Sequence, residues 1–296
     1  MSEFKKVGLP GPWVDPTVNE IGPWRSTTGI VKFIEFVVPI PEMDQRAFHL
    51  YWQKHHSPNV MNVTPFSQFM RKYNTGHAYP RPVEAVPERY VQDGLFVGAA
   101  EVWLNSESEV GDWLGHPLYA ELVQPDEPRF IAQDGRTRLL VTKEERVYVP
   151  DLDLNENDRT KVYLLYKRAE RFDAESFHSG LSKVCNCIAS DTAARKSLLK
   201  MTISHKLADP NSIQGLPEAD IDAVVELWFE DRLQLRRFFQ EPVLSDLSQW
   251  ENLTLDGMPA RAVVAKMKVV HDEFSFQPSV TQPLLFDWSE MESDAQ

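Results

Sequence analysis

The sequence predicts an α+β fold in which two tandem ferredoxin-like βαββαβ repeats together form an α/β-barrel. Segments with strand and helix patterns follow one another in the order β-α-β-β-α-β, and the same order then recurs. Short motifs also recur at matching places: EVWL at 101–104 matches ELWF at 226–229, and HPLYAEL at 116–122 matches EPVLSDL at 241–247. Both pairs share one offset along the chain, which indicates an internal duplication.

The first repeat is expected to cover residues 30–149, after an extended arm at 1–29 that is rich in Pro and Gly and carries Trp13 and Trp24. Its strands are predicted where β-branched and aromatic residues run between turn residues. These strands are 29–38, 66–78, 94–104 and 138–149. Its helices are 45–56, with Asp44 as N-cap, and 106–122, where Ser106 and Glu109 form a capping box.

The second repeat is expected to cover residues 161–275, after a polar, acidic linker at 150–160. Its elements follow from the same signals. The predicted strands are 161–168, 198–207, 219–230 and 261–271, and the predicted helices are 173–188, capped by Asp173, and 231–247. The remaining residues, 276–296, form an acidic tail, in which PLLFDW (283–288) is expected to dock as a strap.

A ferredoxin-like half leaves one face of its sheet bare, because both helices cover the other face. Such a face is a large apolar patch, and pairing two of them is favourable at about 25 cal/mol per Å² of apolar area. The two halves of this chain can pair with each other, or the pairing can occur between chains in a homodimer. A ligand pocket is then expected between sheet and helices of a half, and not inside the barrel.

The composition of the chain limits the kinds of molecule that the protein is expected to bind. The formal net charge of -13 disfavours binding to nucleic acid or to an anionic membrane, both of which need a basic surface. The N-terminal segment lacks the apolar core of a signal peptide, and no apolar run is long enough to span a membrane. Cys185 and Cys187 are too close in sequence for a disulfide between them. We therefore expect a cytoplasmic protein whose partner is a small molecule.

Three segments of the first repeat resemble a known family. Residues 48–60 (FHLYWQKHHSPNV) form an aromatic-rich helix that ends in His-x-Pro, residues 73–77 (YNTGH) form a Tyr-x-x-x-His strand, and AAEVWL (99–104) is an acidic-x-Trp strand. Together they resemble the EthD-like members of the dimeric α/β-barrel superfamily. The resemblance implies the fold, and it implies activities such as dehydration, decarboxylation, isomerisation, cyclisation or cofactor-free oxygenation.

The second repeat resembles the family more loosely. It keeps Phe177-His178, His205 and Glu226-x-Trp228, but Met201 stands where the first repeat has Tyr73. We therefore interpret His178 and His205 as structural.

Several side chains of the first repeat are expected to share a cavity. Trp52 and His56 are four residues apart on one helix face, and His49 precedes Trp52 by three. Tyr73 and His77 lie on one side of a strand, because alternate residues point the same way. If that side faces the helix, His56, His77 and Tyr73 converge.

The predicted catalytic residues are His56 and His77, as acid and base, and Tyr73, which would hold a developing enolate oxygen. The residues expected to contact the substrate are His49, Trp52, Glu101 and Trp103. For Trp103 the alternative is core packing, and for Glu101 it is an ion pair with a nearby Lys or Arg. A metal held by His49, His56 and His77 is a further alternative, although no metal and no cofactor are expected.

The function predicted from these residues is that of a cofactor-independent lyase, with dehydration first and isomerisation close behind. Its substrate would be a hydrophobic, oxygenated molecule of aromatic or polyketide type. Two alternatives stay open: a cofactor-free or haem-dependent monooxygenase, and a non-catalytic protein that binds small molecules.

Overall fold

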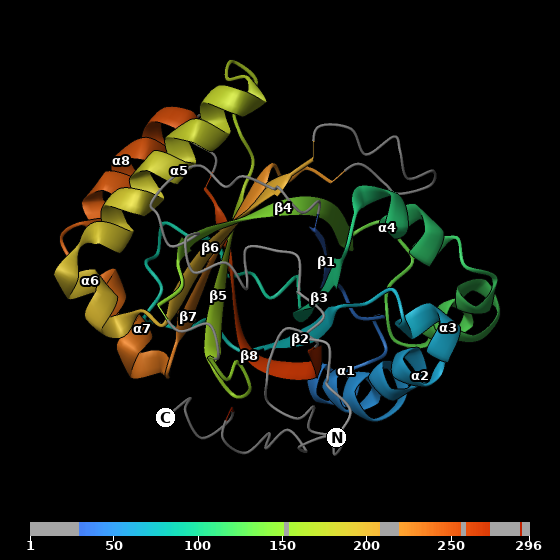
Figure 1. Cartoon of the computed structure of the whole chain (residues 1–296). Coiled ribbons are helices and arrows are strands. Elements are labelled where there is room, and N and C mark those ends of the chain that lie inside the picture. Colours follow the sequence, from blue (N-terminus) through green and yellow to red (C-terminus); the bar gives the residue numbers. More distant parts are fainter. Residues whose placement is uncertain (1–29, 151–153, 208–218, 256–258, 273–290, 292–296) are drawn as a thin grey trace, which may run out of the picture.

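A computed structural model describes residues 30–150, 154–207, 219–255, 259–272 and 291. Within this part of the chain, eight antiparallel strands close into one barrel, with the helices outside it (Figure 1). The predicted arm at 1–29 and the predicted strap at 283–288 lie outside the described residues. No helix in the described part has the length and apolar character needed to cross a membrane.

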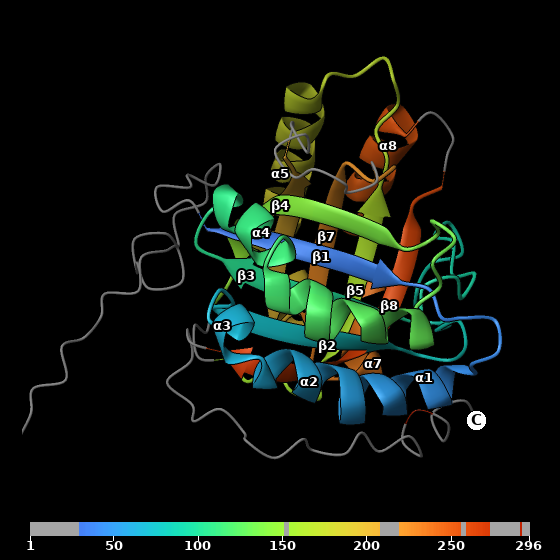
Figure 2. The same cartoon turned by 90° about the vertical axis from the view of Figure 1, so that its right-hand side faces the viewer.

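The first half supplies four strands and the helices on one side of the barrel (Figure 2). Its strands are β1 (Val31–Val37), β2 (Lys72–Ala78), β3 (Gly98–Leu104) and β4 (Arg138–Tyr148). Its helical segments are α1 (Gln45–Tyr51), η2 (Trp52–His56), α2 (Ser57–Asn62), α3 (Thr64–Ser67), α4 (Glu107–Leu114), η3 (Tyr119–Val123) and η4 (Gln124–Arg129).

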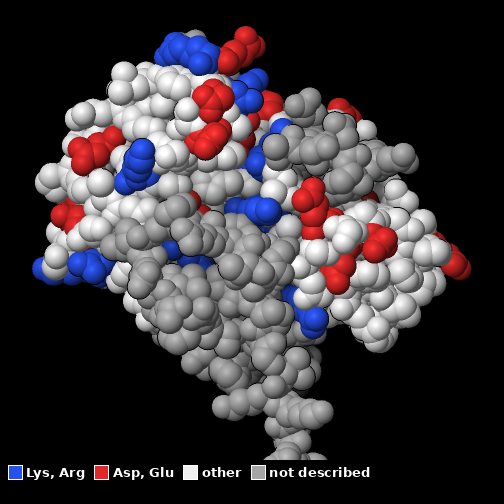
Figure 3. Space-filling model, turned by 45° about the horizontal axis from the view of Figure 1, so that its top comes forward, with Lys and Arg blue, Asp and Glu red and all other residues white. Residues whose placement is uncertain are grey.

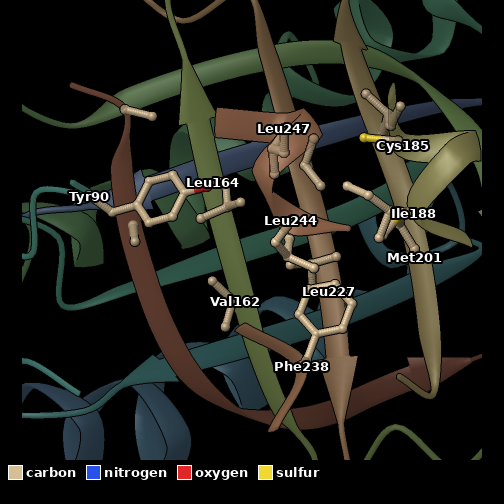
Figure 4. Close-up of a cluster of buried hydrophobic side chains, with 14 of the residues drawn as sticks. Tyr90, Val162, Leu164, Cys185, Ile188, Met201, Leu227, Phe238, Leu244 and Leu247 are labelled. Atoms are coloured by element: carbon tan, nitrogen blue, oxygen red, sulfur yellow. The ribbon is translucent and has the colours of Figure 1, made fainter. Parts of the chain in front are cut away.

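The second half supplies the other four strands and covers the opposite side. Its strands are β5 (Thr160–Tyr166), β6 (Lys200–Lys206), β7 (Ala223–Phe229) and β8 (Arg261–Asp272). Its helices are α5 (Ala174–Ser190), α6 (Thr192–Ser197), α7 (Arg232–Phe239) and α8 (Leu244–Thr254). Figure 4 shows part of the apolar cluster that packs these helices onto their strands.

The strand order around the barrel is β1-β3-β2-β8-β5-β7-β6-β4. Strands β2 and β8 pair antiparallel at one seam between the halves, and β4 and β6 pair at the other. The predicted fold class is therefore confirmed. The two sheets pair inside one chain, which answers the question that the sequence left open.

Several predicted elements have different bounds, and three of them differ as follows. The strand predicted at 66–78 begins only at Lys72, because residues 64–67 form the short helix α3. Each half was expected to have a single second helix, but both helices break before a proline, at Pro117 and Pro242. Proline lacks the N–H that the helix interior needs, so a break is expected there. The repeated motif HPLYAEL/EPVLSDL thus marks a helix break that both halves share.

The two halves begin their first helix in the same way. Asp44 accepts a hydrogen bond from the Ala47 backbone N–H at 2.8 Å, and Asp173 accepts one from the Ser176 N–H at 2.7 Å. Both are N-caps, as predicted.

On the face in Figure 3, acidic and basic side chains are interspersed over the part of the chain that is described.

Candidate functional site

A cavity of about 130 Å³ lies outside the barrel, between the first-half strands and the helices that cover them. Figure 2 shows this side, with α1, α2 and α4 over β1, β2 and β3. Its lining is mostly apolar and aromatic, with a few polar groups, as in many small-molecule sites. The lining residues include Phe33, Glu35, Trp52, His56, Phe66, Tyr73, Trp113, Tyr119 and Glu127.

Two π-helical turns build part of the cavity wall. The turn η2 carries Trp52 and His56, and the turn η3 carries Tyr119 and Val123. Such turns are rare and occur frequently at functional sites. The corresponding first helix of the second half, α5, is continuous from Ala174 to Ser190.

His56 is held by a carboxylate. Its Nδ1 lies 3.0 Å from Asp126 Oδ2, and the Tyr51 hydroxyl donates to the other oxygen of the same group. A carboxylate can only accept, so the imidazole carries its proton on Nδ1 and its lone pair on Nε2. Burial lowers the pKa of His56, although Asp126 opposes this shift. His56 is therefore a neutral, oriented imidazole at neutral pH, which is the state of a general base.

Two glutamates in the lining were missed by the sequence analysis. Burial, together with the charge of Glu127, raises the pKa of Glu35 to about 8. Burial also raises the pKa of Glu127, to about 6, although a 2.7 Å hydrogen bond from the Tyr119 hydroxyl opposes this. At neutral pH Glu35 is mostly a neutral acid and Glu127 mostly an anion. Environments that separate the pKa values of two carboxyl groups in this way often define one group as an acid and the other as a base.

Tyr73 lines the cavity, as predicted from its place on the strand. Its hydroxyl accepts a hydrogen bond from Trp52 Nε1 at 3.3 Å and lies 3.2 Å from Ser57 Oγ. Burial raises the pKa of Tyr73 to about 12, so the hydroxyl keeps its proton at neutral pH.

His77 does not line the cavity, and its predicted pairing with His56 is wrong. It is fully buried, with Nδ1 2.8 Å from His49 Nδ1 and Nε2 3.0 Å from the Thr75 hydroxyl. Burial lowers the pKa of His49 to about 3 and that of His77 well below its usual range. The three-histidine metal site fails for the same reason, because His56 lies in a separate environment.

The second half repeats this histidine pair. The ring centroids of His49 and His77 are 4.7 Å apart, and those of His178 and His205 are 4.5 Å apart. In both halves the pair joins the first helix to the second strand. We therefore assign these histidines to the packing that both repeats share.

Glu101 and Trp103 were placed on the wrong face of their strand. Gly98, Ala100 and Val102 alternate with them, and it is Ala100 and Val102 that line the cavity. Glu101 instead points into the barrel, where its Oε1 lies 2.5 Å from Lys32 Nζ and 2.6 Å from Lys161 Nζ. Trp103 lies beside it, with its ring under Lys32 Nζ at 4.6 Å. The ion-pair alternative for Glu101 and the packing alternative for Trp103 are the ones that the contacts support.

Strand registers align the two halves residue by residue and reveal what differs. Glu35 pairs with Ala100 as Leu164 pairs with Val225, and Tyr73 pairs with Val102 as Met201 pairs with Leu227. Counting from the shared N-caps, Trp52 corresponds to Leu181. Leu164, Leu181 and Met201 all belong to the buried apolar cluster, and Figure 4 labels Leu164 and Met201. The second copy thus fills with apolar side chains the place that carries polar groups in the first.

Comparison with known proteins agrees with the fold. Residues 40–134 match the profile of the EthD domain, so the first half carries an EthD domain. No functionally curated protein matches the sequence.

Solved structures share the architecture at low identity. An anthrone oxidase-like protein superposes with a TM-score of 0.56 at 8% identity, over 87% of this chain and 100% of that one. A protein from Lactobacillus acidophilus NCFM, provisionally described as a monooxygenase, gives a TM-score of 0.49 at 8% identity, over 83% and 97% of the two chains. A mutant chlorite dismutase from Candidatus Nitrospira defluvii gives 0.42 at 11% identity, over 81% and 92%. The first of these similarities supports the same barrel fold.

Proposed function

We propose that the first-half cavity is the active site of an enzyme that removes a proton next to the carbonyl group of a compact hydrophobic molecule. His56 acts as the base and Glu35 as the acid. The observation that carries this proposal is the presence of an oriented neutral imidazole and a neutral carboxylic acid in the lining of one apolar cavity. In this acid–base pair, Glu35 takes the place that the sequence analysis gave to His77.

The reaction would proceed by proton transfers alone. His56 Nε2 takes the α proton, and the imidazolium that forms is stabilised by the Asp126 carboxylate. The carboxylic acid of Glu35 donates a hydrogen bond to the oxygen on which enolate charge develops, and the Tyr73 hydroxyl can donate a second one. Return of the proton to the same carbon gives exchange, and return to another carbon gives isomerisation.

The ionised Glu127 supports this division of roles. Its charge is one of the two causes that keep Glu35 protonated, because two neighbouring carboxylates do not ionise together readily. The Tyr119 hydroxyl in turn holds Glu127 in place.

An oxygen-dependent reaction is the second candidate. The dehydratase activity expected from the sequence finds no support in the comparisons, whose names are oxidase-like, monooxygenase and dismutase. An enolate formed in the cavity could reduce dioxygen, so that R₂CH₂ and O₂ give R₂C=O and H₂O. The first step is the same proton removal by His56, and oxygen uptake distinguishes the two outcomes.

A haem does not fit this cavity. A porphyrin is several times larger than the space of about 130 Å³. We therefore derive no step through haem.

The proton-removal step can be measured with acetophenone in D₂O. We expect the protein to accelerate deuterium entry into the methyl group by about 100-fold or more over buffer, in the range of general acid–base catalysis. NMR follows the exchange, and an oxygen electrode in the same experiment tests the second candidate. Exchange no faster than in buffer, with acetophenone shown to bind, would contradict the proposed function.

The exchange rate is also expected to depend on pH in a bell-shaped way. His56 must be neutral, and burial lowers its pKa, so the rate falls only when the pH drops below the usual histidine range. Glu35 must be protonated, so the rate falls as the pH rises through about 8. A rate that keeps rising above pH 9 would show that the Glu35 proton is not needed.

A further inference from the structure

The cavity lining contains acidic side chains without basic side chains to balance them. The lining residues, all from the described part of the chain, include Glu35 and Glu127 but no Lys or Arg. His56 does not compensate, because burial keeps its imidazole neutral. An anionic ligand would meet a negative field without a cationic partner, in an apolar site where charges interact strongly.

The size of the cavity is that of a single ring. Its volume is about 130 Å³, and an apolar cavity of about 150 Å³ in another protein takes up benzene. The wall is stiff on one side, because Phe66 stacks between Trp113 and Tyr119 with ring centroids 5.2 and 5.4 Å apart. Phe33 and Trp113 pack in a T-shaped arrangement, with ring centroids 5.3 Å apart. Rings packed in this way leave a slot that suits a flat molecule.

One polar group of the lining has no partner in the described part of the chain. Glu35 lines the cavity, and its carboxyl group forms no hydrogen bond and no ion pair with the described residues. Glu35 is a donor while it keeps its proton. A ligand in the cavity that carries a hydrogen-bond acceptor would supply the partner that the described residues do not provide.

We propose that this site selects an uncharged, one-ring compound that carries a carbonyl oxygen as hydrogen-bond acceptor, and that it excludes carboxylates of the same size. Glu35 is the specificity-determining residue for the carbonyl. The inference rests on the proposed function for the location of the site, but it concerns binding, which is measured without turnover.

Four ligands of similar size test the proposal on the intact protein at pH 7. Acetophenone has the acceptor, ethylbenzene lacks it, benzoate is an anion and benzylammonium is a cation. From titrations followed by NMR, we expect acetophenone to bind about 5- to 20-fold more tightly than ethylbenzene, as one or two hydrogen bonds predict. Benzoate should bind at least about 100-fold more weakly than acetophenone.

A Glu35→Leu variant removes the donor and introduces the side chain that the second half carries at the equivalent position, Leu164. Acetophenone affinity should fall about fivefold, and ethylbenzene affinity should not fall. Glu35→Gln is the matched control: its amide can still donate, so acetophenone should still bind while exchange is lost.

Two results would overturn the selection rule: benzoate binding as tightly as acetophenone, or benzylammonium binding more tightly than either. Equal losses of acetophenone and ethylbenzene affinity in Glu35→Leu would reduce Glu35 to a packing role. These outcomes differ from a failure of the proposed function, which would appear as selective binding of acetophenone without exchange.

Discussion

Replacing Glu35 with glutamine is expected to lower the rate of acetophenone exchange by about 10²–10⁴-fold, the usual contribution of a general acid or base. The substitution keeps the size of the side chain and removes only its ionisable proton. Because Glu35 is not part of any hydrogen bond or ion pair in the described part of the chain, the fold should lose little stability. NMR of the exchange reaction and urea unfolding of both proteins measure the two effects.

A parallel substitution tests the base. His56→Gln should lower the rate to a similar extent, because it removes the imidazole nitrogen that accepts the proton. Combining the two substitutions should cost much less than the sum, since groups that act on one proton transfer work as a unit.

The control for both is Glu42→Gln, which changes the same chemical group at an exposed position before α1. Its exchange rate should equal that of the unchanged protein. If Glu35→Gln also exchanges at the full rate, Glu35 is only a polar wall residue and the acid must be sought elsewhere. Loss of exchange accompanied by loss of the cooperative unfolding transition would instead indicate a folding defect.

The barrel could be predicted from the sequence because its determinants are local and repeated. Alternating strands, N-caps at Asp44 and Asp173, and motifs at one offset specify two equivalent halves. The uncovered faces of two such sheets can be buried in few ways other than against each other. The site was predicted less well, since spacing places side chains on the same face of an element without saying which face meets the helices. Trp103 and Glu101 were misplaced for this reason.

Glu35 was missed although a signal was present. It lies in a run of apolar residues that predicts a buried strand, where a carboxyl group is costly unless it is paired or functional. Aligning the two repeats would have drawn attention to it, because Leu164 occupies the equivalent place. Glu127 carries no comparable signal, since it belongs to a short helical turn that only the tertiary structure brings to the cavity.

The barrel interior makes a second strong prediction, and here it concerns stability. Lys32 and Lys161 each lie between the carboxylates of Glu101 and Glu226, and all four side chains are fully buried. Lys32 also contacts a third carboxylate, that of Glu144 in its own half, at 3.2 Å. The four groups come from β1, β5, β3 and β7, so each half contributes one lysine and one glutamate. Each lysine therefore contacts a carboxylate from its own half and one from the other.

Glu226→Leu is expected to destabilise the protein by about 3–5 kcal/mol, because it leaves two buried lysines to share the remaining carboxylates. Burial opposes ionisation of Glu226, but Lys161 and Lys32 overcome this and lower its pKa to about 2. Since the folded pKa lies below the unfolded value, this stabilisation is complete at neutral pH, is lost progressively as the pH falls below the usual glutamate range, and is gone once the pH has fallen through about 2. Urea unfolding at pH 7 measures the loss.

Two further variants separate ion pairing from mere loss of packing. Glu230→Gln removes a carboxylate that pairs with Arg159 at the exposed end of the same strand, and it should cost no more than about 1 kcal/mol. The double variant Lys161→Met/Glu226→Leu removes one cation and one anion together, and it should recover much of the stability that Glu226→Leu loses. If the double variant is as unstable as the sum of its single changes, the buried charges do not act as a pair.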